Sequence, residues 1–512
     1  MMRTRDTFLI VSSIALSMLI ASLDLMVVTT SLPTIIGQLK GFDYYTWPLI
    51  IFSLTTAIAT PLMGKMSDVY GFKPIYLFGL VIFLIGSIMN GLAGNIWVLI
   101  VGRGIQGIGG AVLISNSLTV VGLLFEPVKR TKYMGILGTT SIVAMILGPT
   151  LGGWITSTFD WHWIFWINIP IILTAFGLVV FAHFPKITDD DIHHPIDFLG
   201  AIVLILTMVP LLLVFTWAGN KYAWGSLIII ALSVGTAVML SIFISVEFKA
   251  KNPIVPLEMF KKMTFDSSAI NMFLINGILG AVLVFVPLYL QSVLGFSASL
   301  AGDFLTPMMI SMVVAMLIGG IVVEKTGKYK LQTILGIVIT GIGAFLLTGL
   351  TVTTANLNVV LDLAIFGFGA GLAIPVFTSI AQSSFPESQM GAVTAGIQLF
   401  KNLGQTIIPS LLSTAMMHEM SAKMSNVNWR HLPNIVTGSL KNVNNISNPG
   451  FFKELETKLP ASVLESVKLI INDLRHVLVH SIDSVLWWAV ALTAISLIVQ
   501  TAAKEIKLVQ KK

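Results

Sequence analysis

Two side chains of opposite charge lie inside segments that are otherwise apolar. Asp24 belongs to the first apolar segment, and Arg103 lies about seven residues inside a later one. A charge at that depth of a bilayer costs about 2.5–3.5 kcal/mol by insertion scales, so it is seldom kept without a partner. A buried carboxylate beside a cation can bind and release a proton as their separation changes. We therefore predict that Asp24 and Arg103 pair for proton coupling; the alternative is a static ion pair between two helices.

The apolar segments that hold these charges recur along the whole chain. Of the 512 residues, 55% are hydrophobic and only 11% are charged, whereas a soluble domain carries about 25% charged residues. Apolar runs of 18 or more residues repeat, which predicts an all-α membrane protein with many spans. The sequence has no cysteine, which excludes disulfides, thiolate metal sites and cysteine nucleophiles.

Fourteen spanning segments are predicted. They are residues 8–36, 47–66, 74–93, 96–124, 132–157, 163–184, 197–217, 224–246, 267–290, 301–323, 331–351, 357–381, 391–417 and 482–503. An even number places both termini on one side, and lysine and arginine residues concentrate in the loops of that side. Only Lys40 and Lys221 fall in short loops on the other side. The positive-inside rule therefore predicts that both termini are cytoplasmic, and the pI near 9.3 does not indicate nucleic-acid binding.

Two hydrophilic connections are candidates for more than linking spans. Residues 185–196 hold three aspartates beside two histidines; we interpret them as a solvated hinge rather than a metal site. Residues 418–481 form a long connection on the outer side. Within it, residues 461–480 show helical amphipathic spacing, which predicts a helix lying on the outer surface or over the exit.

Further polar side chains occur in the later spans, and no enzyme signature accompanies them. Asp303 starts the tenth span and Asp362 opens the twelfth, while Lys401 is a second cation at membrane depth. The sequence has no phosphate-binding GxxxxGK[ST] loop, no HExxH and no nucleophile–base pattern. GRGIQGIGG lies inside a span rather than after a strand, so it does not indicate nucleotide binding. The chain is not expected to be an enzyme, and transport would be secondary.

Several motifs occur in a fixed order. LDLMVVTTSLP contains Asp24, GKMSDVYGFKP follows the second span, and RGIQGIGG begins at Arg103. LGPTLGG in the fifth span contains a proline that should kink the helix. GGIVVEKTGKYK, after the tenth span, weakly repeats the loop after the second, which indicates an internal repeat.

Together with WHWIFWINIP and NPIVPLEMF, these motifs resemble the major facilitator superfamily and, within it, the fourteen-spanner drug:proton antiporters of the EmrB/QacA type. The resemblance assigns proton coupling to the helix 1 and helix 4 motifs and conformational change to the other two. The candidates for proton coupling and substrate binding are Asp24, Arg103, Gln106, Asp303 and Asp362. The gating residues that the resemblance implies are Gly64, Asp68, Gly71, Lys73, Gly148, Pro149, Gly152 and Gly153.

The resemblance also implies an architecture. Residues 1–184 and 263–512, the latter including 418–481, would form two six-helix bundles, and residues 185–262 would carry two inserted helices. Spans 1, 4, 9 and 12 would line a central cavity, and spans 5 and 13 would meet between the bundles. The candidates for the cavity wall are Asn271, Asn276 and Gln398.

The implied function is proton-coupled export of amphipathic, cationic drugs by alternating access. The coupling ion is the proton, and no cofactor or metal is expected. The expected partners are a small-molecule substrate, protons and membrane lipid, with no nucleic acid, and the expected setting is a monomer in a bacterial cell membrane. The alternative is export of one defined metabolite or lipid by the same fold, because Asp24 is the only central acid.

Overall fold

The computed structural model describes residues 4–41, 44–184, 197–219, 221–425 and 461–505. These residues form α-helices joined by short turns, without a β-sheet in the described ranges. The helices are α1 (Thr4–Leu39), α2 (Trp47–Tyr70), α3 (Phe72–Gly91), α4 (Ile96–Leu124), α5 (Pro127–Thr158), α6 (Trp163–Trp166), α7 (Asn168–Phe181), α8 (Phe198–Trp217), α9 (Leu227–Lys249), α10 (Met263–Ser292), α11 (Ala298–Thr326), α12 (Lys330–Leu347), α13 (Asn356–Ser383), α14 (Met390–Met424) and α18 (Ala461–Ala502).

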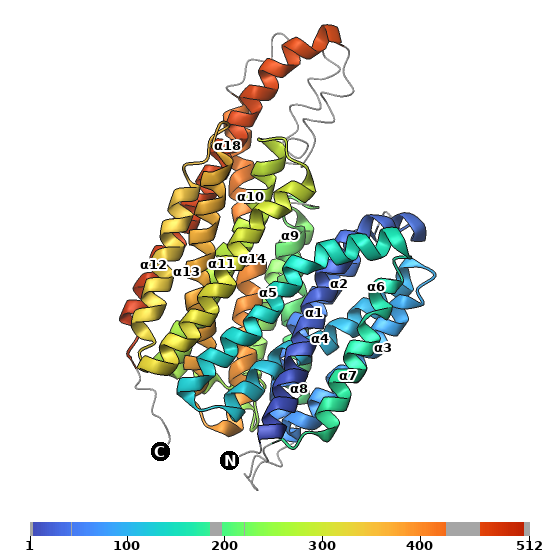
Figure 1. The fold of residues 1–512 in the computed structure, drawn as a ribbon, viewed down its shortest axis with the longest axis vertical. Helices are drawn as coiled ribbons and strands as arrows, with labels where there is room; N and C mark the ends of the chain where they lie inside the picture. Colours follow the sequence, from blue (N-terminus) through green and yellow to red (C-terminus); the bar gives the residue numbers. More distant parts are fainter. Residues whose placement is uncertain (1–3, 42–43, 185–196, 220, 426–460, 506–512) are drawn as a thin grey trace.

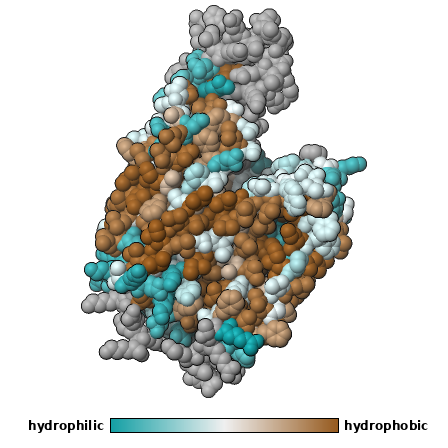
Figure 2. Space-filling view, viewed as in Figure 1, coloured by the Kyte–Doolittle hydropathy of each residue, from teal (hydrophilic) through white to brown (hydrophobic). Residues whose placement is uncertain are grey.

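Thirteen helical stretches in the described chain are long and apolar enough to cross a membrane. The short α6 and α7 together count as one of them, Trp163–Phe181. The fourteenth long helix, α14, is less apolar, because Gln398, Lys401, Asn402 and Gln405 interrupt it. Apolar side chains cover the middle of the visible face and hydrophilic ones gather toward its ends, as expected for a protein that crosses a bilayer (Figure 2).

The long helices gather into two groups (Figure 1). In one group, α1 packs against α5 and α7, and α4 packs against α2 and α3. In the other, α10 packs against α14 and α18, and α13 packs against α11 and α12. We call these groups the N-terminal half and the C-terminal half, and we call the side of the bundle where α1 begins and α18 ends the terminal side.

The halves meet through helix pairs other than those predicted. The fifth and thirteenth predicted spans, which are α5 and α14, were expected to meet. Instead α5 packs against α11 and α13, and α14 packs against α2 and α4. Gly148 and Gly152 of the helix 5 motif face α1 inside the N-terminal half. A Cβ on Gly152 would lie 2.9 Å from the carbonyl oxygen of Val27, and one on Gly148 would lie 2.4 Å from Cβ of Met26. Their small size therefore allows close packing within one half, not contact between halves.

Helices α8 and α9, which were predicted to be inserted between the two bundles, lie beside the contact between α2 and α14. Helix α8 packs against both of those helices, and α9 packs against α8. Ser410 of α14 donates a hydrogen bond to the carbonyl oxygen of Phe215, at 2.6 Å. Trp224, just before α9, donates to Oγ1 of Thr414, at 2.7 Å. The insertion is therefore fixed to the C-terminal half while it touches the N-terminal half.

The last helix corrects another expectation. Residues 461–480 do not lie across the outer surface; they continue into the final span as the single helix α18, which projects beyond the bundle (Figure 1). Helix α14 also extends past its predicted end, and its Met416 and Met420 share an apolar cluster with Leu474 and Leu478 of α18. The two helices shield each other's apolar faces there, which favours two long arms over one surface helix. Residues 426–460 of this connection, and the 185–196 loop, lie outside the described residues.

Candidate functional site

Asp24 and Arg103 form an ion pair at the centre of the N-terminal half. Asp24 is 1% exposed and Arg103 is fully buried. Nη1 of Arg103 donates to Oδ2 of the carboxylate. The other carboxylate oxygen accepts two further hydrogen bonds, from Nε2 of Gln106 and Nδ2 of Asn168, each at 2.8 Å. Helices α1, α4 and α7 thus meet on one carboxylate.

The ion pair belongs to a larger buried network. The carbonyl oxygen of the Gln106 side chain accepts from Nη1 of Arg103 and from Nδ2 of Asn90, both at 2.8 Å. Asn168 also donates to Oγ of Ser87, at 2.8 Å, which brings in α3. Nη2 of Arg103 has no hydrogen-bond partner in the described part of the chain. The side-chain oxygens of Asn90 and Asn168 are likewise unpaired among the described residues. The remaining hydrogen bonds, strengthened by the low-dielectric interior, tie α1, α3, α4 and α7 together.

The glycines of RGIQGIGG let α4 approach its neighbours. A Cβ on Gly107 would lie 2.1 Å from Oγ1 of Thr55 on α2, and one on Gly109 would lie 2.5 Å from the backbone nitrogen of Phe83 on α3. No larger residue fits either place without moving the backbone. Helix α4 therefore lies wedged between α2 and α3, which places Arg103 and Gln106 within reach of α1 and α7.

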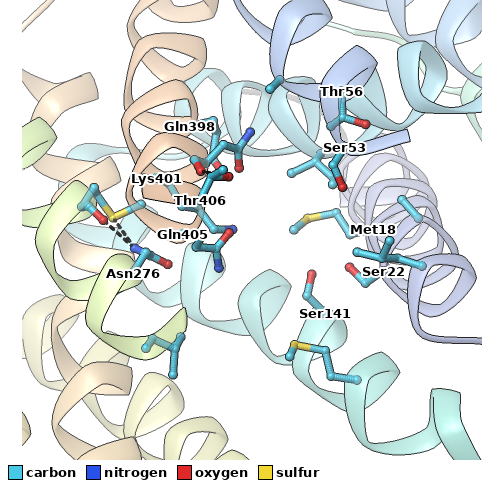
Figure 3. A pocket seen from close by; sticks show the side chains of 18 of the residues that line it. Met18, Ser22, Ser53, Thr56, Ser141, Asn276, Gln398, Lys401, Gln405 and Thr406 are labelled. Atoms are coloured by element: carbon cyan, nitrogen blue, oxygen red, sulfur yellow. Dashed lines mark hydrogen bonds between the residues drawn. The ribbon is translucent and has the colours of Figure 1, made fainter. Parts of the chain in front are cut away.

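A cavity of about 620 Å³ lies between the two halves. Figure 3 shows side chains from both halves around it. Its polar wall from the N-terminal half is Ser22, Ser53, Thr56 and Ser141. Its polar wall from the C-terminal half is Asn276, Thr378, Gln398, Lys401, Asn402, Gln405 and Thr406. The remaining wall is mostly aliphatic and methionine side chains, which suits an amphipathic ligand.

Phe52 of α2 connects the cavity with the ion pair. Its side chain lines the cavity, and its ring centroid is 4.2 Å from Cζ of Arg103. Arg103 and Asp24 themselves are not among the residues of the cavity wall. The Phe52 ring therefore covers the guanidinium on the cavity side, and the face of an aromatic ring attracts the positive charge of Arg103.

The other predicted residues divide between the cavity and elsewhere. Asn276 and Gln398 line the cavity, whereas Asn271 points to α18, where Nδ2 donates to Oε1 of Gln500 at 3.1 Å. Asp303 is exposed, Asp362 is partly buried, and neither belongs to the cavity wall.

The loop motif after α2 joins the halves on the terminal side. Each carboxylate oxygen of Asp68 accepts a backbone N–H from the first turn of α14, Gly391 at 2.7 Å and Ala392 at 2.8 Å. Gly64 lies against the same turn, where a Cβ would be 2.7 Å from the carbonyl oxygen of Gly391. An acid at a helix N-terminus satisfies backbone donors that lack an intrahelical partner.

The rest of that motif stays within the N-terminal half. Gly71 has φ +88°, a backbone conformation that favours glycine, where the chain turns from α2 to α3. Nζ of Lys73 donates to the carbonyl oxygens of Val180 and Ala182 at the end of α7, at 2.9 and 2.8 Å. These two residues shape and fix the turn that presents Asp68.

Further polar contacts join the halves on the terminal side. Lys132 of α5 and Glu324 of α11 form a salt bridge of 2.9 Å. Gln382 of α13, fully buried, donates to the carbonyl oxygen of Leu118 on α4 at 3.0 Å. Leu49 at the start of α2 and Thr216 at the end of α8, both near the other side of the bundle, line the cavity instead. The halves are thus joined on the terminal side, and the cavity extends toward the opposite side.

The comparisons with known proteins agree with this arrangement. The family model described as Major Facilitator Superfamily matches residues 14–409. The chain belongs to the major facilitator superfamily. This superfamily member is 36% identical over 409 residues to the Multidrug transporter protein MdtP of Bacillus subtilis, covering 80% of this chain and 75% of that protein. It is 34% identical over 420 residues to Multidrug resistance protein 3 of the same organism, covering 82% and 81%.

Solved structures show the same fold. The human organic anion transporter MFSD10 matches with a TM-score of 0.59 at 18% identity, over 81% of this chain and 94% of that one. The proton:xylose symporter XylE matches with a TM-score of 0.57 at 15% identity, over 98% and 96%. The superfamily member is therefore an all-helical transporter and not an enzyme.

Sequence reasoning did not single out three members of the buried network: Ser87, Asn90 and Asn168. Ser87 and Asn90 are three residues apart on α3, so they share a helix face. That spacing of polar residues inside an apolar span was an available signal, although it does not reveal the partner. No sequence feature indicated a role for Phe52, because apolar residues are common in membrane spans.

Proposed function

We propose that this superfamily member exports amphipathic compounds in exchange for protons, by alternating access, as a drug:proton antiporter of the fourteen-span type. The observation that carries the proposal is the buried Asp24–Arg103 pair beside a cavity of drug size. Helix α1 contributes Asp24 to the network and Ala21, Ser22 and Leu25 to the cavity wall. The names of two relatives, a multidrug transporter and a multidrug resistance protein, support the substrate type.

Asp24 is the proton-binding group in this mechanism. As a carboxylate it accepts three hydrogen bonds, one of them from the guanidinium. Protonation removes the charge that holds Arg103, so α1 and α4 lose their strongest attraction and can move apart. Because α1 also forms part of the cavity wall, the change in packing is passed to the ligand site. Phe52 lies between the ion pair and the cavity, so it separates the proton site from the substrate site.

Alternating access follows from the contacts between the halves. With both termini in the cytoplasm of a bacterial cell, the terminal side faces inward, and the cavity extends outward as in an outward-facing state. Opening inward requires α14 to leave Asp68 and Lys132 to leave Glu324. Each proton that enters contributes about 2.3 kcal/mol per 100 mV of membrane potential, enough to sustain a useful substrate gradient. The protein acts as a monomer, with membrane lipid around it.

Proton flux in proteoliposomes tests this proposal. Wild type and Asp24→Asn are compared under an inward proton gradient while amphipathic substrates are offered and internal pH is followed by a dye. We expect substrates to dissipate the gradient in wild type and not in Asp24→Asn. Asp266→Asn, which changes a partly buried acid of α10 away from the cavity wall, should behave as wild type. Equal coupling in Asp24→Asn would place the proton site elsewhere. If no substrate moves protons in wild type, export of a single metabolite becomes the better account.

A further inference from the structure

Lys401 places a cation in the central cavity. It lies eleven residues into α14, about 16 Å along the helix axis at 1.5 Å per residue, which is near the middle of a 30 Å membrane core. Its side chain is partly buried and lines the cavity. Gln398 and Gln405 lie three residues before it and four after it, so the three side chains share one face of α14 (Figure 3).

This cation has no counter-ion. Among the described residues, Lys401 makes neither a hydrogen bond nor a salt bridge, and the cavity wall contains no aspartate or glutamate. The other deep cation, Arg103, has Asp24, and Lys132 has Glu324. Asp24 cannot compensate Lys401, because it is buried inside the N-terminal half, is not part of the cavity wall, and already accepts three hydrogen bonds. The cavity is therefore electrostatically unbalanced in favour of a negative ligand.

An ammonium group without a counter-ion is costly at this depth of a membrane. A bound anion removes that cost, whereas a bound cation adds repulsion in a low-dielectric site. Amide groups nearby strengthen the preference: Nε2 of Gln398 or Gln405 can donate to the same anionic group that Lys401 binds. The apolar body of such a ligand would contact methionines such as Met145, Met312 and Met316, whose flexible side chains adapt to varied shapes.

We propose that the cavity takes amphipathic organic anions, with the carboxylate, sulfonate or phosphate group paired to Lys401, rather than the cationic drugs that the family resemblance implies. This inference rests on the proposed export function and names its substrate class. It has an electrical consequence. One-for-one exchange of an organic anion for a proton moves two elementary charges across the membrane, whereas exchange of a cation for a proton moves none. Export of the preferred substrate is therefore driven by membrane potential as well as by the pH gradient.

The test uses one apolar body with three head groups: pyrenebutyrate, pyrenebutanol and pyrenebutylamine. Binding to the purified transporter in nonionic detergent is measured by fluorescence. We expect wild type to bind pyrenebutyrate about tenfold or more tightly than pyrenebutylamine, since a hydrogen bond to a charged group contributes that much. Lys401→Gln should abolish the preference while leaving pyrenebutanol binding unchanged, and Lys401→Glu should reverse it.

Two further variants serve as controls for the binding experiment. Lys401→Arg keeps the charge and should keep the preference, which excludes general misfolding as the cause of a change. Lys251→Gln removes an exposed lysine that is not part of the cavity wall, so this variant should bind the three probes as wild type does. Equal or tighter binding of pyrenebutylamine by wild type, no binding of pyrenebutyrate, or a preference that survives Lys401→Gln would each overturn the inference.

Transport of the same probes separates this inference from the proposed function. In proteoliposomes with a potassium diffusion potential, pyrenebutyrate export should accelerate when the compartment from which it leaves is made negative. Charge-selective binding without proton-linked transport would refute the antiport and leave the anion site standing. Proton-linked transport of pyrenebutylamine alone would keep the antiport and refute the anion site.

Discussion

At the scale of single residues, the N-terminal half is organised around one carboxylate. Asp24 was predicted to need Arg103 because neither charge could remain alone at that depth, and the structure brings the two together. Cost arguments of this kind identify the pair but not its supporting amides. Asn168 begins α7, where a polar residue is unremarkable in sequence, yet it donates to both Asp24 and Ser87. Only the packing of α7 against α1 and α3 reveals that role.

Replacement of Asn168 by alanine tests the support of the carboxylate. Asn168→Ala leaves Asp24 with two donors instead of three. Because hydrogen bonds to charged groups contribute about 1.5–3 kcal/mol, we expect a clear fall in thermal stability in detergent, with proton-linked transport reduced but retained. Asn358→Ala, at an exposed position of α13, is the matched control. Unchanged stability in Asn168→Ala would mean that the third donor is dispensable.

At the scale of helices, hydropathy predicted the long helices well because each must cover the same membrane thickness. The pairing of those helices could not be predicted in the same way. The glycines of the helix 5 motif indicated a close helix–helix contact without showing which helix would use it, and the partner proved to be α1. The continuity of α18 was also missed, since it depends on the α14 extension that packs against it.

Adjacent glycines of the helix 5 motif offer a matched comparison. A Cβ on Gly152 would lie 2.5 Å from Oγ1 of Thr30 and 2.9 Å from the carbonyl oxygen of Val27, whereas a Cβ on Gly153 meets nothing within 4 Å. Overpacking of this kind costs about 1–3 kcal/mol. We expect Gly152→Ala to lower the melting temperature and transport rate, and Gly153→Ala to leave both unchanged or slightly raised. Similar behaviour of the two variants would show that α1 and α5 do not pack tightly in the working protein.

At the scale of the whole molecule, the terminal side is held by helix packing and by a small number of polar contacts between the halves. Those of Asp68, Lys132 and Gln382 all cross the boundary. None of them could be predicted as a pair from the sequence, because the partners are separated by more than 190 residues along the chain. A small set of polar contacts suits a boundary that must open and close, since each can be broken at modest cost.

Loss of the Asp68 contact should shift the balance between conformations. Replacing a carboxylate that caps a helix by alanine costs about 0.5–2 kcal/mol, so Asp68→Ala should expose the closed side more often. A cysteine introduced as Gln382→Cys, buried in this state, reports the change by its rate of thiol labelling, because the protein has no cysteine of its own. We expect labelling roughly tenfold faster, as 1.4 kcal/mol implies. Glu258→Gln, exposed, is the control; equal rates in both would contradict the role of Asp68.

Helix α18 has 42 residues, about 63 Å at 1.5 Å per residue, or roughly twice the thickness of the membrane core. It contains no proline, so no proline kink separates its membrane-spanning part from its projecting part. A helix of this length acts as a lever, because a small tilt of its membrane-spanning part produces a larger displacement at its projecting N-terminal end. Its exposed positions above the bundle, such as Asp473, are thus natural places for a spectroscopic label that follows the transport cycle.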